Sequence, residues 1–213
     1  MWTPTTATAG LWQGSAGTGA GTYTTALPTT TNFYTSMKRG QWANGAGNNI
    51  QVGQRNTENM FFRGSVTGQG GFFFFCRFGT TTWTAGNRLF VGFSTGTTAI
   101  TTVNPSGLTN IIGFGIDAGD TAITFMHNDN TLTATKAAIA GQPALASNQG
   151  YDAYIYAKPN DTVVYYRLVD LNTGTEIVNT SVNTNLPVNT TMMAAHALMG
   201  NAANNAAGTA QIG

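Results

Sequence analysis

The sequence predicts an all-β protein, an antiparallel β-sandwich with an extended N-terminal arm. Composition and spacing predict this class. Asp, Glu, Lys and Arg make up only 8% of the 213 residues, against about 25% in ordinary soluble domains, so neutral Thr, Asn, Ser and Gly must keep the surface hydrated. Thr and aromatic residues favour strands, while Gly and Asn favour turns. From residue 59 onward such runs alternate at the spacing typical of a sandwich or barrel.

The first 55 residues differ from the rest of the chain. Residues 14–21 consist of Gly, Ala, Ser and Thr, which offer little to a core. Trp2, Trp12 and Trp42 interrupt this composition, and a free disordered tail rarely keeps that many aromatic residues. We therefore divide the chain into an extended arm for assembly or anchoring, 1–55, and a β-sandwich domain, 56–213. The arm is expected to pack on its own sandwich or on a neighbouring subunit.

The strands of the sandwich follow from runs of β-branched and aromatic residues. They are expected at 60–66, 71–78, 88–94, 111–117, 123–127, 133–139, 151–157, 162–169, 176–182 and 192–198. Turn residues separate them, as in Asp117-Ala118-Gly119-Asp120 and Asn172-Thr173-Gly174. Residues 192–199 are also the best helix candidate, but the run is too short to decide between helix and strand.

Four consecutive phenylalanines, Phe72 to Phe75, carry more information than any other strand. Side chains alternate between the faces of a strand, so Phe72 and Phe74 point one way and Phe73 and Phe75 the other. An exposed Phe pair shows about 150–250 Å² per ring, which approaches the patch size that soluble monomers avoid. We expect the opposite sheet to cover one face, and the arm or another subunit to cover the second. The expected assembly interface comprises Trp2, Trp12, Trp42, Phe73 and Phe75.

Charge and cysteine usage exclude several classes of protein. The net charge is +1 and the basic residues are scattered, so we expect no nucleic-acid partner. No run approaches the ~20 apolar residues of a membrane helix, and the N-terminus does not resemble a signal peptide, so we expect no membrane insertion and folding in a cytosol. Cys76 is the only cysteine and sits among phenylalanines, where a small buried hydrophobe is expected.

The acidic residues offer few candidates for chemistry. Asp117 and Asp120 could meet as a carboxylate pair, which a glycosidase requires, but Asp at both ends of an Ala-Gly turn is also what local backbone hydrogen bonding selects, and we favour the turn. The segment from His127 to Asn130 lacks the spacing of a calcium loop. A single calcium ion near Asp117, Asp120 or Asp129 stays open as an alternative. With His196 and Cys76 as the remaining soft ligands, structural zinc is not expected.

Gly92-Phe93-Ser94-Thr95-Gly96 matches the Gly-x-Ser-x-Gly pattern of serine hydrolases. That mechanism needs a helix directly after the serine, whereas the next residues are β-branched and end at Pro105. We therefore predict no catalytic residues, no cofactor and no metal site, and we do not expect an enzyme.

The central region resembles a known family in several ordered motifs. They include Gly71-Phe72-Phe73-Phe74, residues 104–113, Asp117-Ala118-Gly119-Asp120-Thr121, Met126-His127-Asn128-Asp129 and Leu171-Asn172-Thr173-Gly174. From about Gln41 to the C-terminus they resemble a β-sandwich domain of tailed-bacteriophage virion proteins, the tail-fibre or receptor-binding family. The resemblance implies a lectin-like or jelly-roll sandwich that is made in the bacterial cytoplasm. It also implies assembly as a homotrimer at the virion surface, with other virion proteins as partners.

The resemblance also implies the function we expect first, a tail-fibre or tail-tip protein that binds host-surface glycan. Trp83 is the candidate glycan contact, because an exposed indole can stack on a pyranose ring, although ordinary loop packing would also explain it. The alternative is a capsid decoration or head-fibre protein with a structural role. A polysaccharide depolymerase is the weaker alternative, since paired carboxylates are not evident.

Overall fold

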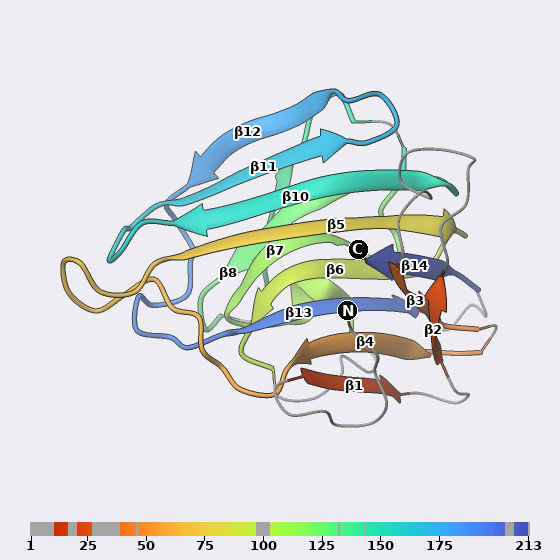
Figure 1. Ribbon diagram of the computed structural model, residues 1–213, viewed down its shortest axis with the longest axis horizontal. Helices are drawn as coiled ribbons and strands as arrows, with labels where there is room; N and C mark the ends of the chain where they lie inside the picture. The colour runs from red at the N-terminus through yellow and green to blue at the C-terminus, as the bar shows by residue number, and fades with distance from the viewer. Residues whose placement is uncertain are drawn as a thin grey trace.

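Two antiparallel sheets pack face to face and contain all the named strands of the described structure (Figure 1). The computed structural model describes residues 11–16, 21–26, 39–45, 47–96, 103–131, 133–142, 144–202 and 207–212. The prediction of an all-β sandwich is confirmed. Among these residues the only regular helix is a short 3-10 turn, η2 (Pro105–Gly107), and no helix is long and apolar enough to cross a membrane.

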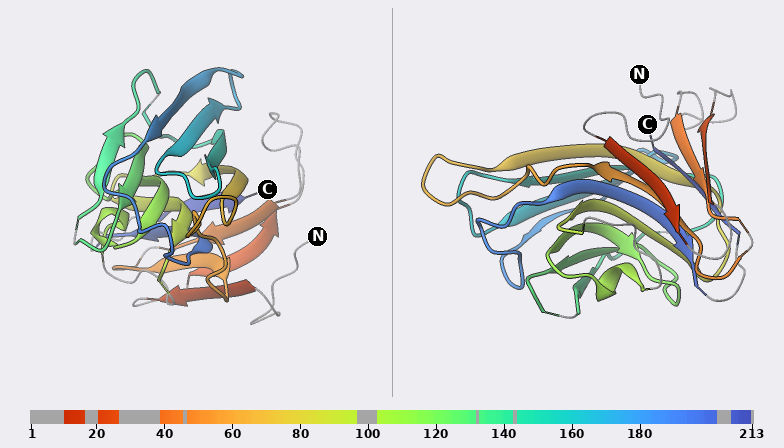
Figure 2. Two further views of the ribbon diagram at one scale, coloured as in Figure 1. Left: turned by 90° about the vertical axis from the view of Figure 1, so that its left-hand side faces the viewer. Right: turned by 90° about the horizontal axis from the view of Figure 1, so that it is seen from below.

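The first sheet has seven strands and bows along its length, as β13 and β6 show in the right-hand view of Figure 2. Across the sheet the order is β1 (Leu11–Ala16), β4 (Gln51–Asn56), β13 (Ala194–Asn201), β6 (Asn87–Ser94), β7 (Ile111–Ile116), β8 (Thr124–Asn128) and β9 (Thr135–Ala138). Every residue of β6 and β7 is buried, because these central strands are covered on both faces.

The second sheet also has seven strands. Their order is β12 (Glu176–Val182), β11 (Val164–Asp170), β10 (Gln149–Ala157), β5 (Phe72–Thr82), β14 (Thr209–Ile212), β3 (Arg39–Ala43) and β2 (Thr22–Ala26). Alternating residues of β11 are buried and half-buried, so this sheet has one face on the core and one face outward.

Aromatic rings fill the space between the sheets. Phe93 of the first sheet lies 4.6 Å from Phe72 and 5.1 Å from Phe74 of the second, measured between ring centroids. Farther along, Phe125 stacks on Tyr166 at 3.8 Å. A smaller apolar cluster lies on the other face of the first sheet and includes Phe90, whose neighbours in the strand point into the main core.

The predicted strands correspond to β5 through β13, with one exception. Residues 60–66 form no strand beyond an isolated bridge between Phe61 and Met193, so that prediction is wrong. The physical reason is a tight loop. Gly64 has φ of 117°, and a Cβ there would meet the Gln69 carbonyl oxygen at 1.8 Å, while the buried Arg63 donates a hydrogen bond to the Asp161 carbonyl. The undecided helix candidate, residues 192–199, is not helical, and most of it lies in strand β13 (Ala194–Asn201).

The segment 1–55 contributes strands to both sheets where it is described. β1 and β4 belong to the first sheet, β2 and β3 to the second, and the boundary placed after residue 55 falls inside β4. These strands pack on their own sandwich, which is one of the two arrangements expected for the arm. Trp42 is only 1% exposed and lies in the core, so its assignment to an assembly interface is wrong. Trp2 and the side chain of Trp12 lie outside the described residues.

Candidate functional site

Several loops meet at one end of the sandwich, the right-hand end in Figure 1, which we call the loop end. The connection 83–86 joins the end of β5 to the start of β6. Gln149 at the start of β10 pairs with Thr80, and Tyr151 pairs with Asp170 at the end of β11, so the segments 144–148 and 171–175 lie at the same end.

Trp83 is half-buried at the loop end and packs against the main core cluster. Its backbone N–H donates to Ser147 Oγ at 3.0 Å. The next residue, Asn148, is exposed, and its carbonyl oxygen accepts a hydrogen bond from Asn172 Nδ2 at 3.0 Å. The loop end thus carries a partly exposed indole, the hydroxyl of Ser147 and the amide of Asn172. An indole can stack on a sugar ring, and hydroxyl and amide groups can form hydrogen bonds with its hydroxyls.

Sequence reasoning found Trp83 but missed Ser147, Asn148 and Asn172. No local signal marks these three residues, because Asn and Ser are common in every turn of this chain. Trp83 and Ser147 are 64 positions apart, and only the pairing of β5 with β10 brings them together.

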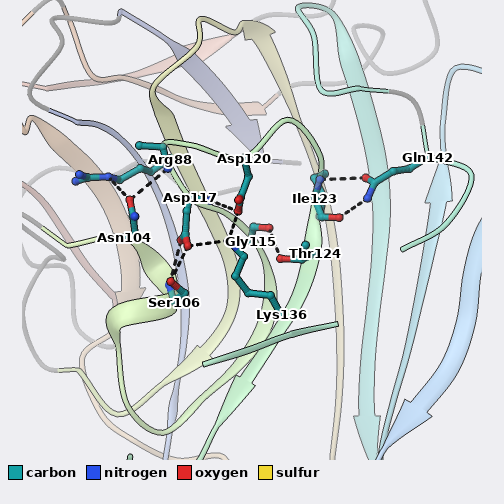
Figure 3. Close-up of polar contacts among 11 residues, drawn as sticks. Arg88, Asn104, Ser106, Gly115, Asp117, Asp120, Ile123, Thr124, Lys136 and Gln142 are labelled. Carbon is teal, nitrogen blue, oxygen red and sulfur yellow. Dashed lines mark hydrogen bonds and ion pairs between the residues drawn. The ribbon is translucent and has the colours of Figure 1, made fainter. Parts of the chain in front are cut away.

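A polar network of charged and neutral side chains lies near the same end of the first sheet (Figure 3). Asp117 Oδ2 accepts hydrogen bonds from Ser106 Oγ at 2.6 Å and from Lys136 Nζ at 3.0 Å. The same Lys136 Nζ lies 2.5 Å from Asp120 Oδ2. One ammonium group therefore holds both carboxylates, and although burial lowers the pKa of Lys136, its hydrogen bonds to Asp120 and Asp117 raise that pKa overall.

The turn interpretation of Asp117 and Asp120 is confirmed. The Asp120 N–H donates to the Asp117 carbonyl at 3.0 Å, and the Asp117 N–H donates to Asp120 Oδ2 at 3.1 Å. Asn104 Oδ1 extends the network by accepting from Arg88 Nε at 2.9 Å and from the Ala118 N–H at 3.2 Å. The two carboxylates are engaged in fixing a turn, and this arrangement gives no support to a pair that flanks a scissile sugar bond.

The polar groups of the segment from His127 to Asp129 already form hydrogen bonds within the chain. His127 Nδ1 lies 3.1 Å from the Asn185 carbonyl oxygen, and Asp129 Oδ1 accepts from the Thr131 N–H at 2.9 Å. Burial lowers the pKa of His127, against the raising effect of its backbone hydrogen bonds. Within the ranges that the structure describes, no three His, Cys, Asp or Glu side chains converge as a metal site.

The Gly-x-Ser-x-Gly match places its serine at the buried end of β6. Ser94 Oγ lies 2.8 Å from His196 Nδ1, which is the distance of a nucleophile and its base. The residue that pairs with His196 in β4 is Arg55, a cation and not the carboxylate of a triad. Burial, and secondarily the charge of Arg55, lower the pKa of His196 to about 4. Ser94 and His196 are 1% and 3% exposed.

The phenylalanine run alternates as expected. Phe72 is buried against the first sheet, while Phe73 and Phe75 point outward and are 68% and 47% exposed in the single chain. The described residues of this chain therefore leave the first part of the outward face of β5, around Phe73 and Phe75, open to solvent. Sequence reasoning missed the rings that accompany this pair, Tyr154 and Tyr156 of β10, although their spacing of two was a readable signal.

Comparison with known proteins identifies the architecture. No protein-family model matches the sequence, and no curated protein is significantly similar to it. Among solved structures, peanut lectin with a nine-residue peptide superposes with a TM-score of 0.57 at 10% identity, covering 96% of this chain and 95% of that one. This chain has a lectin fold.

Two further lectins share the architecture. Basic winged bean lectin with Tn-antigen gives a TM-score of 0.51 at 14% identity, covering 95% of this chain and 89% of that one. Winged bean acidic lectin complexed with methyl-α-D-galactose gives 0.51 at 10% identity, with 95% of each chain covered. At these identities the likeness establishes the fold alone, and the lectin-like sandwich implied by the sequence motifs is confirmed.

Proposed function

We propose that this protein is a glycan-binding domain displayed on the surface of a tailed-bacteriophage virion, as part of a tail fibre or tail tip. The observation that carries the glycan-binding part is the superposition on peanut lectin over 96% of the chain. The winged bean lectins of the same architecture were solved with a Tn-antigen and with a galactoside. The virion part rests on the ordered motifs between Gly71 and Gly174.

The chemistry of the loop end supports a neutral glycan. Stacking needs an aromatic face, which the half-buried Trp83 offers, and sugar hydroxyls need both donors and acceptors, which Ser147, Asn148 and Asn172 provide. Only 8% of the residues are charged, so recognition relies on neutral hydrogen bonds. Affinity for a single sugar is expected to be weak, and several copies on one particle would strengthen attachment through multivalency.

A glycan array tests the proposal. The purified full chain is expected to bind surface polysaccharides of the host bacterium. Trp83→Ala should reduce that binding at least tenfold, and Asn172→Ala should weaken it. Asn130→Ala serves as the matched control, because Asn130 is also an exposed turn asparagine but follows β8 away from Trp83. The proposal fails if the folded protein binds no glycan, or if the Trp83 and Asn130 variants bind equally.

The alternative function is a capsid decoration or head-fibre protein. The outward pair Phe73 and Phe75 favours it, because an exposed apolar face suits contact with other protein. Imaging of particles labelled with an antibody against this chain distinguishes a tail-fibre protein from a capsid decoration protein. Label at the tail tip is the expected result, and label over the capsid would replace the tail assignment with the structural one.

A depolymerase remains the weakest candidate. Release of oligosaccharide from host polysaccharide, lost in both Asp117→Asn and Asp120→Asn, would be needed to restore it. We expect no release, because Lys136 binds both carboxylates.

A further inference from the structure

The outward face of the second sheet carries a continuous group of aromatic side chains. We call it the aromatic face, and it consists of Phe73, Phe75, Tyr154, Tyr156 and Tyr165. The strand register sets this arrangement. Phe73 pairs with Tyr156, and Tyr156 pairs with Tyr165. Two residues farther along β5, Phe75 pairs with Tyr154. The five residues lie on three paired strands, β5, β10 and β11. Phe73 and Phe75 are the most exposed apolar residues of the face, at 68% and 47%.

We propose that the aromatic face binds the same face of a second copy of this chain, in a two-fold symmetric contact. This inference does not rest on the proposed glycan-binding function. Two phenylalanines open to water on one regular sheet face, with three tyrosines beside them, approach the size of apolar patch that soluble monomers avoid. Sheets with such faces pack against each other about 10 Å apart in β-sandwiches, with interdigitated side chains.

The charges around the aromatic face fit a contact with itself. A two-fold contact brings a surface against its own copy, so a face with excess charge of one sign would repel itself. Here Arg77 Nε and Nη2 are bonded to the two carboxylate oxygens of Asp152 at 2.6 and 2.7 Å. On the next strands Arg167 is paired with Glu176. These four charges cancel within one copy, and burial against a second copy leaves them paired. Lys158, which follows β10 and lies over the ring of Tyr165, adds one positive charge at the end of the face.

The orientation of the rings argues against a sugar as the occupant. Tyr156 and Tyr165 stack on each other, with centroids 4.8 Å apart and planes within 9°. The Arg167 guanidinium lies 5.1 Å from the centroid of Tyr154, and Lys158 Nζ lies 5.7 Å from that of Tyr165. Several ring faces are therefore already occupied from within the chain, whereas a pyranose needs a free ring face. Ring edges and apolar sides remain, and these suit an interdigitated protein contact.

The size of the face is of the order that a dimer needs. Four neighbouring strands, β5, β10, β11 and β12, each at least seven residues long, span roughly 19 by 23 Å in projection. Side-chain relief makes the accessible area larger than this projection. Stable interfaces bury about 800 Å² on each partner, so the contact needs the whole outward surface of these four strands, β12 included, and not the five rings alone.

The oligomeric mass of the full chain tests the proposal. Light scattering coupled to gel filtration should give twice the 22.3 kDa of one chain at micromolar concentration. Phe73→Lys should give the mass of one chain, because it places two like charges in the contact. Val188→Lys is the matched control, since Val188 is 63% exposed and lies outside the aromatic face, and its mass should stay that of two chains. Near-UV circular dichroism checks that each variant is folded.

Charge complementation makes the test independent of any loss of folding. Phe73→Lys and Phe75→Glu variants, each monomeric alone, should form a mixed species of two chains when combined at low salt. A wild-type chain that is monomeric would overturn the proposal. So would a mass of three chains, which the sequence resemblance implies, or a Phe73→Lys variant that stays dimeric. Glycan binding is measured separately, and its loss or retention leaves this outcome unaffected.

Discussion

Ser94 Oγ and His196 Nδ1 lie 2.8 Å apart between neighbouring strands β6 and β13. Both point away from the main core, onto the face of the first sheet that carries Phe90, whose ring lies edge-on to the imidazole at 6.3 Å. His196 Nε2 is buried and has no hydrogen-bond partner among the residues that the structure describes. The imidazole is thus held neutral in an apolar surrounding with a guanidinium nearby, which makes it a structural group that acid can destabilise.

The free energy of unfolding is therefore expected to fall as the pH drops from about 6.5 to about 4. The native pKa of His196 is lowered to about 4, mainly by burial and then by Arg55, from an ordinary 6.5. The unfolded chain binds the proton first, so stability is complete above the unfolded pKa and is lost as pH falls toward the native one, by up to about 3 kcal/mol. Urea unfolding at several pH values measures this.

His196→Asn should flatten that pH profile, with the remaining slope coming from His127, whose pKa burial also lowers. The histidine resonances of the native wild-type protein give a second measurement that does not depend on the variant folding. The His196 signal should not titrate above pH 5. An ordinary titration near 6.5 would contradict the burial argument.

Two ion pairs on the second sheet should differ in their contribution to stability. The side chains of Arg77 and Asp152 are 19% and 9% exposed, while those of Arg167 and Glu176 are 40% and 44% exposed. Arg77→Met should lower the free energy of unfolding by about 1–3 kcal/mol, because it leaves a mostly buried carboxylate without its partner. Arg167→Met should cost less than about 1 kcal/mol, since water screens an exposed pair. Equal losses in denaturant titrations would argue against the role of burial.

Local patterns in the sequence predicted much of the fold, but contacts between distant residues were beyond them. The alternation of Phe72 to Phe75 and the turn between Asp117 and Asp120 both follow from rules that act within a few residues. Strand β13 could not be separated from a helix, since only its place between β4 and β6 decides its conformation.

The candidate sites show the same limit. Trp83 can be selected as a candidate from its residue type alone. Its hydrogen-bond partner Ser147 is 64 positions away, and no sequence motif distinguishes it from the other serines. Ser94 matched a short motif, yet its contact with His196 spans 102 positions and joins two strands whose pairing no local rule predicts. Residue chemistry identifies candidates, and strand pairing decides which of them meet.

Cys76 should resist alkylation in the native protein. Its side chain is buried on the core side of β5, the face opposite to Phe75 and Arg77, and burial, with a further effect of Asp152, raises its pKa to about 12. Thiolate is the reactive form, so labelling by iodoacetamide at pH 8 should proceed only through unfolding and should accelerate strongly in urea. Mass spectrometry of the labelled chain follows this, and rapid labelling without denaturant would contradict the buried position.

Gly92 and Gly113 pair across β6 and β7, and their lack of side chains is a packing requirement. A Cβ on Gly92 would meet the Ile112 carbonyl oxygen at 2.3 Å and the Gly113 Cα at 2.4 Å, and neither backbone atom can move without shifting the sheet. Gly92→Ala should therefore lower the free energy of unfolding by about 1–3 kcal/mol or more. Gly119→Ala is the matched control, because nothing lies within 4 Å of its Cβ, and it should change stability by less than about 0.5 kcal/mol. Thermal unfolding of both variants tests the pair, and equal midpoints would mean that the two sheet strands are not packed this closely.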